Sequence, residues 1–153
     1  MNLTKIIGLA GLSLCLAFTF PGGKDPLHKK KYEALVTEIK DGKPSAKKPA
    51  PDEIEFKNGK VYSSFVYDKT DGGFSDVKYE ISKDSVFTDD SGTEAHYYEI
   101  LAITTNDKNE TINMSFTING YDIEGTYKVI KKDIVKKHFT TIGKEKVKQK
   151  KGS

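Results

Sequence analysis

The sequence predicts an all-β fold, an antiparallel up-and-down β-barrel of about eight strands, with a β-sandwich as the alternative. Segments in which apolar and polar residues alternate follow one another along the chain, and short turns separate them. No segment has the apolar spacing of a convincing amphipathic helix. The barrel is preferred because consecutive hairpins need no long crossover and a closed sheet has no exposed edges.

The first strand is expected over residues 31–40, KYEALVTEIK, which are rich in β-forming residues. The run after it, 41–51, holds three prolines and several lysines, and is expected to be an extended loop. Alternation resumes at Ile54 and Phe56, and Asn58-Gly59 is typical of a two-residue type I′ hairpin turn. These residues predict the first hairpin of the barrel.

The strand beyond that turn is expected to continue through Phe65 to Tyr67, with both aromatic side chains on its apolar face. Further strands are expected over residues 77–82, 85–88, 95–105, 112–118, 121–129 and 134–143. The strand 95–105 has two alternatives, since burial of its odd positions encloses Glu99 and burial of its even positions encloses His96. The sequence leaves this choice open.

The run TINGYDIEGTYKV, residues 117–129, predicts a hairpin that turns on Asn119-Gly120. A two-residue turn at that point pairs Met114 with Gly125 and places the glycine on the apolar, inward face. Glycine weakens a strand, so it is expected where the wall bends sharply or where bulk must be spared inside a tight barrel.

The chain is expected to begin with a secretory signal peptide, residues 1–19. Lys5 precedes an apolar run of about 15 residues, which is short for a membrane-spanning helix. Cys15, the only cysteine, lies in a loose match to a bacterial lipobox, so lipid anchoring there is the alternative to ordinary cleavage. Export to the periplasm, the cell envelope or the extracellular space follows from either alternative.

The rest of the chain divides into a flexible lead (20–30), a barrel domain (31–143) and a Lys-rich, disordered tail (144–153). Sixteen acidic residues lie between positions 52 and 124, whereas the lysines gather toward both ends. The tail is therefore expected to make weak contact with anionic surfaces, and an ordinary solvated surface is the alternative.

All 25 basic residues are lysines. Without the planar fork of arginine, the chain is not expected to read nucleic-acid bases or to clamp a carboxylate with two hydrogen bonds.

Short motifs do not predict catalysis. Asp90-Ser91-Gly92 matches the core of an aspartic protease site, but DDSGTE is better interpreted as a turn. The three histidines, His28, His96 and His138, lack the local spacing of a zinc pair, and no nucleophile motif accompanies them. The acidic loops lack the spacing of a calcium loop. The protein is expected not to be an enzyme, with no cofactor and no metal.

The segments EIEFKNGKVYSSF, VKYEISKD and INMSFTINGYDIEGTYKV resemble small lipocalin-like (calycin-type) β-barrels of the bacterial envelope. The resemblance covers roughly residues 31–143 and implies the barrel architecture. The chain has no Trp, so the Gly-x-Trp signature is missing, and it has no Arg, so the ligand carboxylate site of fatty-acid-binding relatives does not carry over.

The first functional hypothesis is an exported, non-catalytic barrel that binds a small apolar or amphipathic ligand in its interior. The expected ligand-binding residues are the inward-facing aromatic residues Phe65, Tyr67, Tyr79, Phe116 and Tyr127. The alternative is a structural or interaction module of the cell envelope, with a packed core and a charged exterior. The sequence leaves the ligand, the partner and the oligomeric state open.

Overall fold

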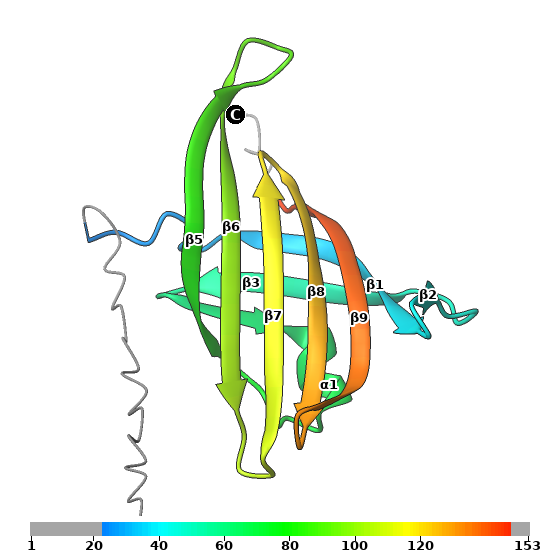
Figure 1. Ribbon diagram of the computed structural model, residues 1–153. Helices are drawn as coiled ribbons and strands as arrows, with labels where there is room; N and C mark the ends of the chain where they lie inside the picture. Colours follow the sequence, from blue (N-terminus) through cyan, green and yellow to red (C-terminus); the bar gives the residue numbers. More distant parts are fainter. Residues whose placement is uncertain (1–22, 148–153) are drawn as a thin grey trace, which may run out of the picture.

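The computed structural model describes residues 23–147 (Figure 1). The predicted signal peptide with Cys15 lies outside these residues, as do residues 148–153 of the tail. The described part holds nine strands and one helix. Their bounds are β1 (Lys31–Lys40), β2 (Lys43–Pro44), β3 (Ala50–Lys57), β4 (Lys60–Ser63), α1 (Ser64–Lys69), β5 (Val77–Thr88), β6 (Glu94–Thr105), β7 (Glu110–Asn119), β8 (Asp122–Lys131) and β9 (Ile134–Glu145).

The strands form an antiparallel up-and-down barrel, as predicted. Neighbouring strands pair in chain order from β3 to β9, and β1 pairs with both β3 and β9, which closes the sheet. β2 adds a short pairing to the end of β1. In Figure 1, β5 to β9 run side by side, while β1 and β3 cross behind them. Because β1 pairs with β9, the barrel wall is continuous from the last strand to the first.

Aromatic rings fill the interior of the barrel. The Phe56 ring meets Tyr79 and Phe116 edge to face, with centroid separations of 5.2 and 5.8 Å. Phe116 in turn meets Tyr127 at 5.7 Å. All four side chains are buried, and aliphatic residues such as Ile112 and Met114 pack around them. Edge-to-face packing of this kind gives the barrel a solid core.

The strand predicted to continue to Tyr67 ends instead at Ser63, and the short helix α1 follows. The reason is local capping, because the Ser63 hydroxyl accepts a hydrogen bond from the Val66 amide and thereby caps the helix. The helix buries Phe65 but leaves Tyr67 41% exposed, so the expectation that both face inward is wrong for Tyr67. No helix among the described residues is long and apolar enough to cross a membrane.

The β7–β8 hairpin has the expected faces but a different register. Asn119 pairs with Asp122, so the turn lies on Gly120-Tyr121, one residue later than predicted. Gly120 has φ +60 and its amide donates to the His96 carbonyl of β6, which holds the turn in this register. Gly125 consequently faces Phe116 rather than Met114, and it lies on the inner face as expected.

Two other sequence expectations are settled by the strand pairings. Lys57 pairs with Lys60 across Asn58-Gly59, which confirms the two-residue turn. From Tyr98 the even positions of β6 face the core, so Tyr98, Ile100 and Ala102 are buried, but His96 is exposed and the expectation that it would be enclosed is wrong. Glu99 points outward, where its carboxylate accepts a hydrogen bond from Tyr97.

The lead and the beginning of the tail are more ordered than predicted. Leu27 is fully buried, and the Lys29 amide donates to the Phe56 carbonyl. β9 extends to Glu145, and the Lys146 amide donates to the Lys31 carbonyl of β1. The lead therefore packs against the barrel, and the domain continues beyond the predicted boundary at residue 143.

Candidate functional site

The five residues predicted to bind a ligand inside the barrel do not form one site. Tyr79, Phe116 and Tyr127 face the core. Phe65 extends from α1 and its ring stacks on that of Tyr127, with 6.4 Å between the ring centroids. Tyr67 lies apart from them on the outside, next to Tyr62. The four buried aromatic residues pack against one another and against other core residues, so their own side chains occupy the space predicted for a ligand.

A buried carboxylate ties α1 to the barrel wall. Asp52 of β3 accepts hydrogen bonds from the Tyr127 hydroxyl at 2.6 Å, the Ser63 hydroxyl at 2.9 Å and the Phe65 amide at 3.0 Å. The Ser64 hydroxyl donates to it at 3.1 Å. Burial, and then the nearby charge of Asp52, raise the pKa of Tyr127 well above its usual value. With donors from α1, β4 and β8, this carboxylate holds the helix in place.

Two more tyrosines lie in the core toward the other end of the barrel. The Tyr79 hydroxyl donates to Asp25 of the lead, and burial raises the pKa of Tyr79. Burial, followed by the charge of Glu145, also raises the pKa of Tyr32. The Tyr32 hydroxyl has no hydrogen-bond partner within residues 23–147. Burial therefore favours the protonated form of both hydroxyls in the folded protein.

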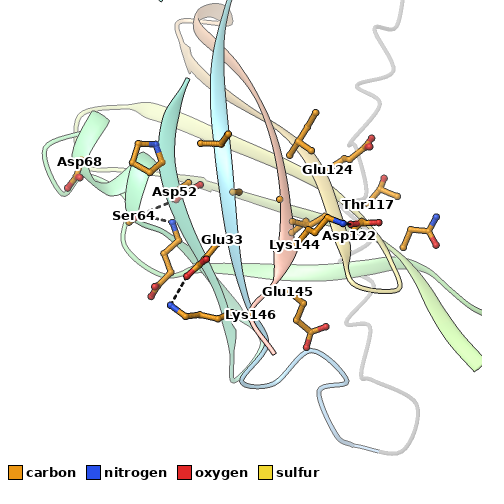
Figure 2. A pocket seen from close by; sticks show the side chains of 18 residues that line it. Glu33, Asp52, Ser64, Asp68, Thr117, Asp122, Glu124, Lys144, Glu145 and Lys146 are labelled. Atoms are coloured by element: carbon orange, nitrogen blue, oxygen red, sulfur yellow. Dashed lines mark hydrogen bonds and ion pairs between the residues drawn. The ribbon is translucent and has the colours of Figure 1, made fainter. Parts of the chain in front are cut away.

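A groove lies on the outer wall of the barrel. This groove has a volume of about 1260 Å³ and runs over β3, β1, β9, β8 and the end of β7 (Figure 2). Strand pairing places Leu35 beside Pro51 on one side and beside Ile142 on the other. Leu35 is 57% exposed and Ile142 is 64% exposed, so these three residues form an apolar row open to solvent.

Small residues on the inner face explain how close this wall comes to the core. Gly143 pairs with Ala34, and a Cβ atom added at Gly143 would lie 2.4 Å from the carbonyl oxygen of Glu33. A Cβ atom at Gly125 would lie 2.6 Å from the Phe116 ring. Without a side chain at Gly143 the β9 backbone lies close to β1, and without one at Gly125 the β8 backbone lies close to the buried Phe116 ring. The groove occupies the outer side of this same wall.

Carboxylates dominate the charge of the groove. Its acidic lining residues are Glu33, Asp52, Glu53, Asp68, Asp122, Glu124 and Glu145. The lysines among the lining residues are Lys144 and Lys146, which pair with Asp122 at 3.4 Å and with Glu33 at 2.7 Å. Among the described residues, neither Glu124 nor Asp68 forms an ion pair. Glu145 and Glu53 pair with Lys30 and Lys31, which lie outside the lining. The lining is therefore acidic, with Glu124 and Asp68 as the acceptors available to a cation.

Sequence reasoning missed this groove, although one signal was present. In the strand 31–40 the inward residues are Tyr32, Ala34 and Val36, so Leu35 is an apolar residue at an outward position. Ile142 breaks the alternation of β9 in the same way. Their contact depends on the pairing of β1 with β9, which closes the barrel and cannot be read from local periodicity.

The motifs considered in the sequence take ordinary structural roles. Asp89 accepts hydrogen bonds from the Ser91 and Thr93 amides, so DDSGTE is a turn, as predicted. His28 accepts from the Asn58 amide, and His96 stacks on Tyr98 with rings 5.7 Å apart. No cluster of potential metal ligands occurs within residues 23–147. No protein-family model, curated protein or solved structure matches the chain.

Proposed function

We propose that the protein is an exported, non-catalytic binding module that uses its outer groove to hold a cationic, partly apolar segment of another polypeptide. The observation that carries this proposal is the row of Pro51, Leu35 and Ile142, which is exposed beside carboxylates on a barrel whose inner aromatic rings pack against one another. This is the second of the two sequence-based hypotheses, made specific by the groove.

The chemistry of the groove favours a polypeptide partner. Its volume of about 1260 Å³ exceeds the 300–1,000 Å³ typical of small-molecule pockets. An apolar strip beside carboxylates complements a segment in which apolar side chains alternate with lysine or arginine. Desolvation of Leu35 and Ile142 would supply affinity, while the unpaired Glu124 and Asp68 would favour positive charge.

Absence of catalysis is part of the proposal. The hydroxyl side chains that line the groove are Ser64 and Thr117, and the Ser64 hydroxyl donates to Asp52. None of the residues that line the groove is a histidine or a cysteine. Export remains a proposal based on the apolar segment of residues 6–20. The likeness to lipocalin-like barrels supports the barrel architecture and contributes no binding residue to the proposal.

The proposal is tested by fluorescence anisotropy with two labelled peptides of equal length, one of alternating Lys and Leu and one of alternating Glu and Leu. We expect the Lys–Leu peptide to bind and the Glu–Leu peptide not to bind, because the groove is acidic. The double variant Leu35→Ser/Ile142→Ser should weaken binding by roughly tenfold or more, since it removes both exposed apolar contacts.

The matched control is Leu101→Ser/Ile103→Ser, which alters two exposed apolar residues of β6 outside the groove. It should bind the Lys–Leu peptide as the unmodified protein does. Equal losses in both double variants, or equal binding of both peptides, would contradict a specific groove.

A further inference from the structure

The β8–β9 hairpin ends in a tight, defined turn. Lys131 pairs with Ile134, which leaves Lys132 and Asp133 as the two central residues. Their φ angles are 52° and 59°, in the left-handed region that a type I′ turn requires at both positions. Lysine rarely adopts a positive φ, so Lys132 is an unusual residue for this position of the turn.

The tip extends past the closed part of the barrel. Among the described residues, β1 pairs with β9 from Phe139 onward, so Ile134 to His138 pair with β8 alone. A register shift between Val129 and Ile130 places a bulge in the same stretch. Figure 1 shows this turn at the lower end of the molecule, where β8 finishes and β9 begins.

Two apolar side chains are exposed at this tip. Ile134 is 57% exposed and Val135 is 49% exposed, although they are adjacent in a strand and point to opposite faces. Neither face of the hairpin is covered at this point. Val135 lies opposite Ile130 across the hairpin, whereas Ile134 lies opposite Lys131 and has no apolar cross-strand partner.

Lysines surround the apolar pair. Residues 131–137 read KKDIVKK, with four lysines and one acidic residue. Lys131 pairs with Glu110 at 3.5 Å, whereas Lys132 and Lys136 are exposed and form no ion pair within residues 23–147. The Lys137 ammonium donates to the Lys69 carbonyl at 3.4 Å, which brings the tip beside the end of α1. Burial and the charge of Lys128 hold the pKa of the neighbouring His138 below its usual value.

We propose that the β8–β9 tip, residues 131–137, docks the protein on the surface of an anionic lipid bilayer. Ile134 and Val135 enter the boundary between headgroups and acyl chains, while Lys132 and Lys136 lie among the anionic headgroups. Lysine suits this role because it is a compact charge that needs no fixed bidentate partner. The exposed apolar residues of this projecting turn complement the acyl chains of such a bilayer, and the unpaired lysines complement its anionic headgroups.

The tip and the groove lie at opposite ends of the same strands. β8 runs for ten residues from Asp122, in the groove lining, to Lys131 at the tip. At about 3.3 Å per residue, its length is about 30 Å. A bilayer bound at the tip would therefore leave the Asp122 end of the groove accessible, whereas Asp68 at its other end adjoins Lys69, which the tip contacts. The tip variants and the groove variants alter different residues, so the two proposals can fail independently.

The test is co-sedimentation of the full chain with phosphatidylcholine vesicles prepared with and without phosphatidylglycerol. Every variant carries the same residues 1–22 and 148–153, so their contributions to binding cancel in the comparison. Ile134→Ser/Val135→Ser and Lys132→Glu/Lys136→Glu should each lower partitioning onto the anionic vesicles by roughly tenfold or more. Both should retain the unmodified melting temperature, because all four side chains are exposed.

The control Leu101→Ser/Ile103→Ser should partition onto anionic vesicles as the unmodified protein does. Unchanged binding in the two tip variants would overturn the proposal, as would equal binding of the unmodified protein to neutral and anionic vesicles. Binding that depends on the lysines but not on Ile134 and Val135, together with equally strong retention on heparin, would also overturn it, in favour of a polyanion site.

Discussion

At the centre of the β1–β9 wall, the inner and outer faces carry residues of opposite size. On the inner face Ala34 pairs with Gly143, and on the outer face their chain neighbours Leu35 and Ile142 pair with each other. A barrel wall would ordinarily place its larger apolar residues inside and its small or polar residues outside. The reversal indicates that this wall is constrained on the inside by close packing, while its exposed apolar residues are available to a partner.

The strongest constraint on the inner side is Asp52, which lies in the same row as Ala34 and Gly143. Asp52→Ala should lower the free energy of unfolding by about 3–5 kcal/mol, because it leaves Tyr127, Ser63 and the Phe65 amide without their buried acceptor. Chemical denaturation would measure the loss. The neighbouring outward substitution Glu53→Ala should change stability by less than about 0.5 kcal/mol. Similar losses in both variants would remove the distinction between the faces.

Gly143→Ala tests the close approach at the centre of the wall. The added methyl group would meet the Glu33 carbonyl and the Ala34 side chain, so we expect a loss of about 1–3 kcal/mol. Ile142→Ala, one residue away and outward, should cost much less because its side chain is exposed. Thermal melting of the two variants compares the two faces directly, and a stable Gly143→Ala would show that the wall can move outward.

Tyr127 and Tyr32 are both buried, but their hydroxyls differ. Tyr127→Phe should lower stability by about 1–2 kcal/mol, since Asp52 loses a donor at 2.6 Å. Tyr32→Phe should be neutral or slightly stabilising, because it removes a buried hydroxyl that has no partner in the described part of the chain. Urea denaturation would separate the two, and a larger loss in Tyr32→Phe would contradict the assignment of the hydrogen bonds.

Alkaline pH should destabilise the fold. Burial raises the pKa of Tyr32, Tyr79 and Tyr127 in the folded protein, whereas tyrosines of the unfolded chain ionise near pH 10. The stabilising effect is therefore complete below about pH 10 and is lost as the pH rises beyond it. Melting temperatures measured at increasing pH should fall above pH 10, and more gradually in Tyr127→Phe. A fall of equal steepness in that variant would assign the effect to other groups.

The smallest effect on stability is expected on the outer face. Leu35→Ser and Ile142→Ser should each change the free energy of unfolding by about 0.5 kcal/mol or less, because both side chains are mostly exposed. Differential scanning calorimetry would measure this. A loss of several kcal/mol would mean that Leu35 and Ile142 serve the fold rather than a partner.

Periodicity was sufficient to predict the barrel, the first strand, the Asn58-Gly59 turn and the inward position of Gly125. It failed at residues 63–67, where the cap at Ser63 and the buried Asp52 turn the chain into a helix. The cap is a local contact with the Val66 amide and the Asp52 contact joins two elements, and alternation of apolar and polar residues carries no information about either. The groove was missed for the same reason, because Leu35 and Ile142 become neighbours only when the last strand closes on the first.

The most direct test of the account is native mass spectrometry of the protein purified from its own host. We predict no small-molecule adduct, because the rings of Phe56, Tyr79, Phe116 and Tyr127 pack against one another inside the barrel. A bound apolar small molecule that persists in Leu35→Ser/Ile142→Ser would place a ligand inside the barrel, and would contradict the assignment of binding to the outer wall.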